Sequence, residues 1–292
     1  MLSFLKVAAF GLLLGLLGNI ASVYDEVRKL EENVGLGLLF QLRGATKAPD
    51  EALVVAIDRE SSERLKLPNN PDRWPRSLHA RLIEALNRAG ARVIVFDLYF
   101  AEPRSPEEDG ALAAAIKKAG NVVLAEQLRS KEVTSAVDAT IDNAGHKIVE
   151  ALKPIEQFSH AAFATAPFVL PRMPVRVSQY WTFQTDAGDA PTFPVLALQL
   201  YTLEAYQDIR ALLEKASPKL AALLPSDASS AIESTGASKF TRNLRQIFRS
   251  DSHVGDALAH VAVGSGNDHR PVGAMVNLYT GTNRQYLNFY GP

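Results

Sequence analysis

Two aspartates close two apolar runs in the first third of the chain. Asp58 ends EALVVAID, which begins at Glu51, and Asp97 ends RVIVFD, which begins at Arg92. Paired carboxylates can hold a hard divalent cation and so support hydrolysis or phosphoryl transfer. Strand-end aspartates also cap the segment that follows them through their side-chain oxygens. Neither aspartate precedes a nucleophile motif or a glycine-rich phosphate loop, so we favour the structural role over the catalytic one.

Trp74 and Arg76 lie between these two runs, on either side of Pro75. An exposed Trp beside an Arg is typical of ligand pockets and of protein contacts. In the alternative interpretation, Trp74 packs over a sheet edge and Arg76 pairs with Asp58 or Asp97, because an arginine fork can satisfy two carboxylates. The two interpretations do not exclude each other.

Asp109 adds a third carboxylate near this edge. It begins the helix expected after the second strand, where the helix dipole favours an acidic residue. A third carboxylate strengthens the metal hypothesis slightly, but a capping role fits better. The candidate ligand-binding residues are therefore Asp58, Trp74, Arg76, Asp97 and Asp109, and we assign no catalytic residue, metal ligand or cofactor.

Other chemical motifs are weak. The absence of cysteine excludes disulfides, thiol catalysis and Cys-based zinc sites. The six histidines form no HExxH pair, and His79 is expected at the surface of a helix. Gly264-Ser-Gly-Asn lacks the GK[ST] ending and the following helix of a phosphate loop. Thirty-one basic and 32 acidic residues give a net charge of -1, which argues against a nucleic-acid surface.

The elements that must position these residues follow a strand-helix-strand pattern, with Gly90 and Gly120 ending the two helices. Such a pattern predicts an α/β fold, with a mostly parallel sheet flanked by helices. Both strand-end aspartates would then lie at the carboxyl edge of the sheet, where open α/β sheets bind ligands. The predicted elements are strand 53–57, helix 75–89 with Ser77 as a possible cap, strand 92–100, helix 111–119 and strand 121–125.

The pattern is less regular beyond residue 129. We expect a helix over 144–152, a strand over 175–184, a helix over 194–205, helices with two proline breaks over 211–250, and a closing strand over 285–290.

Residues 1–24 carry a single charge, Lys6, followed by a long apolar run, and we expect a transmembrane anchor there. A cleaved signal peptide is the second interpretation and a buried soluble helix the third. Positive-inside logic places the N-terminus in the cytoplasm and the body of the protein outside. Residues 25–50 are expected to form a juxtamembrane helix and linker, and residues 51–292 an extracytoplasmic α/β domain.

A family resemblance rests on LVVAID, WPRSLHARLIEAL, GARVIVFDLYFAEP and DGALAAAIKKAGNVVLAE, with LEENVGLGLLFQLRG before them and PTFPVLALQLY and YLNFYGP after them. These segments resemble the CHASE sensory domain of type two, the cyclase/histidine-kinase-associated sensory extracellular domain. The resemblance runs from Ala52 to the end. It implies an extracytoplasmic input domain of a bacterial inner-membrane receptor, with a nucleotide cyclase or kinase as its output.

Three hypotheses follow. The first is a non-enzymatic sensor, homodimeric in the full receptor, that responds to an unidentified small molecule or environmental signal. Its chain would be C-terminally incomplete, either as a fragment or as an independent truncated protein. The second is a membrane-anchored metal-dependent hydrolase or phosphatase that uses Asp58 and Asp97. The third is a non-catalytic dimerisation module whose interface is the surface around Trp74.

Overall fold

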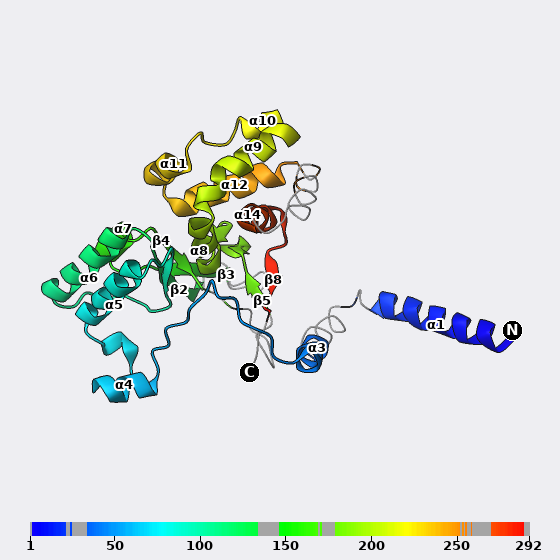
Figure 1. Cartoon of the computed structure of the whole chain (residues 1–292), viewed down its shortest axis with the longest axis horizontal. Helices are drawn as coiled ribbons and strands as arrows, with labels where there is room; N and C mark the ends of the chain where they lie inside the picture. The colour runs from blue at the N-terminus through cyan, green and yellow to red at the C-terminus, as the bar shows by residue number, and fades with distance from the viewer. Residues whose placement is uncertain are drawn as a thin grey trace, which may run out of the picture. The chain divides into compact units, whose positions relative to one another are not determined.

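The computed structural model describes residues 2–21, 24, 34–133, 146–168, 170, 179–251, 253, 255, 258 and 270–288 (Figure 1). Its helices are α1 (Leu2–Ala21), α3 (Leu36–Arg43), α4 (Arg59–Leu65), α5 (Arg76–Arg88), α6 (Pro106–Ala119), α7 (Glu156–Ala161), α8 (Phe193–Tyr201), α9 (Tyr206–Ala216), α10 (Pro218–Ala221), α11 (Ala228–Thr235), α12 (Ala237–Arg249) and α14 (Arg270–Thr280). Its strands are β1 (Ile94–Phe96), β2 (Val122–Val133), β3 (His146–Leu152), β4 (Ala164–Pro167), β5 (Gln179–Trp181), β6 (Phe183–Gln184), β7 (Ala190–Pro191) and β8 (Arg284–Tyr286).

The chain divides into two units. The first comprises Met1–Val55, Leu170–Tyr180 and Gln285–Pro292, and the second comprises Ala56–Val169 and Trp181–Arg284. The second unit contains the sheet formed by β1 to β4 and the helices from α4 to α14.

The first unit begins with α1, in which the predicted transmembrane anchor falls. Among the helices that the structure describes, none has the length and apolar character needed to cross a membrane, so the anchor is not supported. α3 covers the second half of the expected juxtamembrane helix and ends at Gly44, whose φ of 74° is the left-handed conformation that glycine adopts easily.

The central sheet of the second unit is mixed, whereas the sequence predicted a mostly parallel one. β2 pairs in parallel with β1 and with β4 through its first residues. Its remaining residues, from Gln127 to Val133, pair with β3 in an antiparallel ladder. The sequence of β2 changes at the same point, from the buried run VVLA to the more polar QLRSKEV. An apolar run fits a strand covered on both faces, whereas an antiparallel pair tolerates polar residues.

Two predicted elements are wrong. The expected helix at 144–152 is β3 over its described part, because pairing with β2 outweighs the helix propensity of its Lys, Glu, Ala and Leu residues. The expected strand at 53–57 is irregular, with Leu53 84% and Val54 88% exposed. An apolar run becomes a strand only when a neighbouring strand satisfies its backbone groups, and this one pairs with none of the described strands.

Several helices are confirmed. α5 and α6 lie side by side (Figure 1), and both are followed by the predicted glycines, Gly90 and Gly120, which have positive φ. α6 begins earlier than predicted, because Ser105 caps it by accepting a hydrogen bond from the backbone N–H of Glu108. Ser77 is not a cap but the second residue of α5. These helices bury one hydrophobic cluster with β1, β2 and α7, which includes Ile83, Phe96, Phe100, Leu112, Ile116, Leu124 and Phe158.

The second half of the unit is helical, as the sequence predicted. α8 fills most of the range 194–205, and α9 to α12 fill 211–250 with breaks at the predicted prolines. Their buried faces join α14 and β6 in a second cluster, which includes Phe183, Val195, Tyr206, Leu213, Phe240, Leu244, Phe248, Met275 and Tyr279. β5 and β8 confirm parts of the strands expected at 175–184 and 285–290. β6 falls in the first of these ranges as well, and residues 287–288 of the second are irregular. Residues 175–178 and 289–290 lie outside the described residues, as does the GSGN motif at 264–267.

Candidate functional site

The candidate site forms where the N-termini of α5 and α6 meet. Arg76 is the first residue of α5, and Pro75 before it provides no side-chain cap. The cap comes from α6 instead, because Glu108 Oε2 accepts a hydrogen bond from the backbone N–H of Arg76 at 2.9 Å. Glu108 Oε1 also accepts from the hydroxyl of Ser77 at 3.3 Å. A carboxylate at a helix N-terminus offsets the positive end of the dipole, which would otherwise oppose Arg76.

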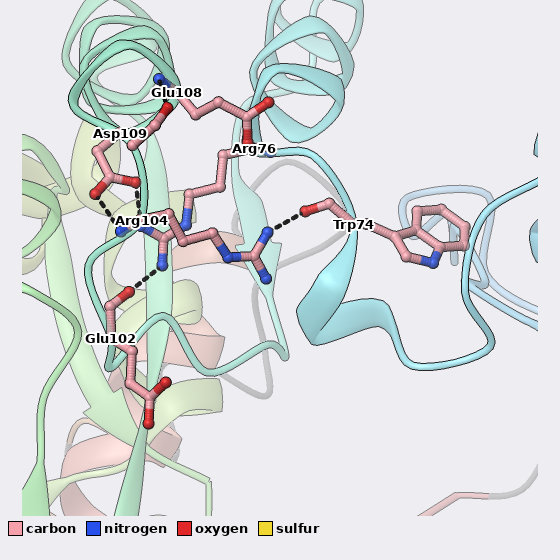
Figure 2. Close-up of polar contacts among 7 residues, drawn as sticks. Trp74, Arg76, Glu102, Arg104, Glu108 and Asp109 are labelled. Carbon is pink, nitrogen blue, oxygen red and sulfur yellow. Dashed lines mark hydrogen bonds and ion pairs between the residues drawn. The ribbon is translucent and has the colours of Figure 1, made fainter.

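Arg76 and Asp109 form the buried centre of the site. The two residues are 3% and 4% exposed. Arg76 Nη1 donates to Asp109 Oδ1, and Arg76 Nη2 donates to the backbone carbonyl of Glu102 (Figure 2). The guanidinium also lies over the ring of Phe158, with Cζ 4.9 Å from the ring centroid. Ion-pair, hydrogen-bond and ring contacts together compensate for the removal of this cation from water.

Arg104 connects this centre to Trp74. Its backbone N–H donates to Asp109 Oδ2 at 2.8 Å, and its Nη1 donates to the backbone carbonyl of Trp74 at 2.5 Å (Figure 2). Burial alone would raise the pKa of Asp109, but hydrogen bonds from Arg104 and Arg76 and the charges of both arginines lower it overall. Asp109 is therefore ionised at neutral pH and acts as an acceptor only.

Trp74 is buried, with 4% of its surface exposed, whereas a residue at a dimerisation surface would be exposed in the single chain. Its indole points away from the two arginines (Figure 2), and Nε1 donates to the carbonyl of Pro68 at 2.7 Å. The indole stacks on His79, with centroids 6.5 Å apart and planes 11° apart. The exposure expected of Trp74 is therefore wrong, and the third hypothesis, in which the surface around it is an interface, stays a prediction.

His79 is also buried, at 3% exposure, whereas the sequence placed it at the surface. Its ring makes edge contacts with Phe96 and Phe100, at centroid distances of 6.0 and 5.6 Å. Burial lowers the pKa of His79 to about 4, and the charges of Arg104 and Arg76 add to the effect. The imidazole is neutral at pH 7 and is part of the hydrophobic cluster.

Asp58 and Asp97 do not belong to this cluster. Asp58 is the exposed N-cap of α4, and its Oδ1 accepts from the backbone N–H of Ser61 at 2.8 Å and from its hydroxyl at 2.7 Å. Those hydrogen bonds lower the pKa of Asp58. Asp97 is exposed, and the structure shows no ion pair between Arg76 and either aspartate.

The structure thus brings Trp74, Arg76 and Asp109 together and leaves the other two candidates outside. The capping role favoured for Asp58 is confirmed, and the predicted pairing of Arg76 with Asp58 or Asp97 is wrong. The reason is that no strand ends at Asp58. Within the described ranges, no group of three His, Cys, Asp or Glu side chains is placed to hold a metal ion.

Sequence reasoning missed Glu102, Arg104, Glu108 and His79. The first three fall in FAEPRSPEED, a short charged segment that follows a buried strand and contains two prolines. Charged residues in such a loop are candidates for contacts with a neighbouring element, and this was the available signal. Chemically, the site has no activated nucleophile. It joins four segments: the loop before α5, α5 itself, the loop after β1, and α6.

One known protein family matches this chain. The family model of the CHASE2 domain covers residues 8–289, nearly the whole chain. Domains of this family are sensory extracellular domains of cyclases and kinases. Neither the curated proteins nor the solved structures include a match.

Proposed function

Because the chain belongs to the CHASE2 domain family, we propose that it is the extracytoplasmic input domain of a receptor. In this proposal the domain detects a small molecule or an environmental signal and passes it to a cytoplasmic nucleotide cyclase or kinase. The receptor acts as a homodimer. The observation that carries the proposal is the family match, which spans residues 8–289.

The Arg76 cluster supports the proposal in a specific way. A sensor needs an element with two arrangements whose balance a signal can shift. Two side chains hold the loop after β1, since Arg76 binds the carbonyl of Glu102 and Asp109 binds the N–H of Arg104. A packed ion pair of this kind is made or broken as a unit, because a half-satisfied buried charge is costly. We propose that the signal acts by releasing or tightening this loop.

The test is a chimeric receptor, in which this chain replaces the CHASE2 domain of a receptor cyclase with its own membrane spans. We expect Asp109→Asn to shift basal cyclic-nucleotide output by about fivefold or more, the usual lower range of coupling between sites. Glu63→Gln is the matched control, because it removes an exposed carboxylate that pairs with Arg59 on α4. Arg104→Gln is a milder second variant, which removes the contact to the Trp74 carbonyl. Equal output from the wild type, both cluster variants and a chimera without the domain would contradict the proposal.

A further inference from the structure

A second buried arginine lies in the helical half of the same unit. Arg245 is on α12 and is 1% exposed, among the largest fully buried side chains. Its Nε donates to Asp189 Oδ2 at 2.9 Å, and its Nη2 donates to the side-chain oxygen of Asn283. The ring of Phe183 covers one face of the guanidinium, with Cζ 3.9 Å from the ring centroid. These contacts fix the plane and the direction of the guanidinium.

One edge of this guanidinium is unused. Arg245 Nη1 is buried and has no hydrogen-bond partner among the residues that the structure describes. Since Phe183 occupies a face and Nε and Nη2 are engaged, the remaining approach is in the plane, at the edge that Nη1 forms. Nη1 therefore offers N–H groups to one oxygen of a carboxylate, in a charge-assisted hydrogen bond.

The charge at this position is also incompletely balanced. Asp189 is the carboxylate that pairs with Arg245, and its side chain is 35% exposed. Water therefore screens the carboxylate while the cation is enclosed. Burial lowers the pKa of Arg245, and the charge of Asp189 opposes that shift only in part. A guanidinium remains protonated even so, and an additional anion would be stabilised beside it.

A second unused donor lies in the same helical half of the unit. Gln199 on α8 is 0% exposed, and its Nε2 has no partner within the described part of the chain. Its Oε1 accepts from the hydroxyl of Tyr279, so the amide nitrogen is free to donate elsewhere. Tyr279 stacks on Phe248 of α12, with centroids 5.3 Å apart. Tyr279 precedes Asn283 by four residues, so Gln199 and Arg245 are both bound to one short segment at the end of α14.

We propose that Arg245 and Gln199 form a binding site for a small carboxylate anion. One carboxylate oxygen accepts from Arg245 Nη1, and Gln199 Nε2 supplies the second donor. Buried polar groups are almost always satisfied. The described residues contain other buried donors without a partner, such as Arg76 Nε, but Arg245 Nη1 and Gln199 Nε2 share one segment, which points to a common acceptor. A neutral acceptor would leave the arginine's charge under-compensated, and a carboxylate supplies both acceptor oxygens and charge.

The proposed route of entry is the turn between β6 and β7, where Asp189 is the partly exposed partner of Arg245. In this turn Gly188 and Asp189 have successive positive φ values of 67° and 56°. The left-handed conformation is unfavourable for a residue other than glycine, so the turn is held in place by its contacts. Those contacts come from α12, because Arg242 Nη1 donates to the carbonyl of Gly188 at 3.3 Å and Arg245 binds Asp189. Anion binding is measured on this chain without any receptor, so its test does not depend on the proposed sensory role.

The experiment compares thermal unfolding of the full chain in sodium acetate and in sodium chloride of equal ionic strength. We expect acetate at about 100 mM to raise Tm by about 2–4 °C over chloride, and acetamide, its neutral analogue, to have no effect. The shift is lost in Arg245→Lys and in Gln199→Leu. It is retained in Arg249→Lys, a matched change at an exposed arginine one turn further along α12.

If Arg245→Lys does not fold, Gln199→Leu decides the question. A direct signal comes from the side-chain Nε–H resonance of Arg245 in a nitrogen-15 spectrum, which we expect to move on acetate titration and not on chloride titration. Equal Tm values in acetate and chloride would overturn the proposal, and the unused donors would then be satisfied by water. An acetate shift that persists in both Arg245→Lys and Gln199→Leu would also overturn it, because the anion would be bound elsewhere.

Discussion

Two buried arginines in one unit of this protein are compensated in different ways. Arg76 has a carboxylate partner that is itself buried, a carbonyl acceptor and an aromatic ring. Arg245 also has an aromatic ring, but its carboxylate partner is partly solvated. Each guanidinium has one buried nitrogen without a partner among the described residues, Nε in Arg76 and Nη1 in Arg245. The burial of the carboxylate partner is therefore what distinguishes the two pairs. We infer that the Arg76 pair stabilises the fold, whereas the less compensated charge of Arg245 is available to bind an anion.

The first arginine is the place where a single change should have the largest effect. Asp109→Asn preserves the shape of the side chain but leaves the Arg76 cation buried without a counter-charge. Removal of one partner from a buried ion pair costs about 3–5 kcal/mol. We therefore expect the free energy of unfolding, measured by urea titration with tryptophan fluorescence, to fall by about that amount.

Two further variants sharpen this prediction. Glu63→Gln breaks an exposed pair, and such pairs contribute about 0–1 kcal/mol. The double variant Arg76→Met with Asp109→Leu replaces the pair by apolar side chains and should cost much less than Asp109→Asn alone. If Asp109→Asn lowered the free energy of unfolding no more than Glu63→Gln does, the Arg76–Asp109 ion pair would not be essential to the stability of the fold.

The region around Arg76, called the first region below, also contains the buried His79, and the region around Arg245 is the second region. The folded-state pKa of His79 is about 4 against an ordinary value of 6.5. As the pH falls below the ordinary value, the unfolded chain takes up a proton that the folded chain refuses, so stability decreases. The loss begins near pH 6.5, is complete near pH 4 and amounts to about 3 kcal/mol.

The measurement is urea unfolding at steps between those two pH values. His79→Phe removes the titrating group and should flatten the dependence, whereas His160→Gln, at an exposed position on α7, should leave it unchanged. The described residues around Arg245 include no histidine, so we expect acid to weaken the first region before the second. A pH dependence that survives in His79→Phe would assign the effect to another group.

The elements of both regions differ in how far the sequence predicts them. α5, α6 and α8 to α12 follow from apolar periodicity and from glycine or proline stops, which are local signals. The predictions for 53–57 and 144–152 are wrong, because the presence or absence of a partner strand determines whether each segment forms a strand. A local pattern does not say whether that partner is present.

The sites depend even more on tertiary structure. The sequence placed Arg76 near three aspartates, but the path of the loop after β1 selects Asp109. A signal for Arg245 is present in the sequence of its helix. Thr241 and Arg245 lie on the same helical face as Phe240, Leu244 and Phe248. A cation on an apolar face predicts a buried charge that needs a partner, but it does not identify the partner.

The smallest loss of stability is expected at Arg245, and this prediction tests the comparison of the two arginines most directly. Asp189→Asn removes the carboxylate partner of Arg245, as Asp109→Asn does for Arg76. The Asp189 side chain is 35% exposed, so solvent already screens much of its attraction for the guanidinium. We expect a loss of about 1 kcal/mol in the free energy of unfolding, measured by urea titration as for Asp109→Asn. The substituted side chain would retain an amide oxygen as an acceptor for Arg245 Nε, which limits the cost further. Equal losses for the two variants would mean that burial of the carboxylate does not distinguish the two regions, and both arginines would then belong to the fold alone.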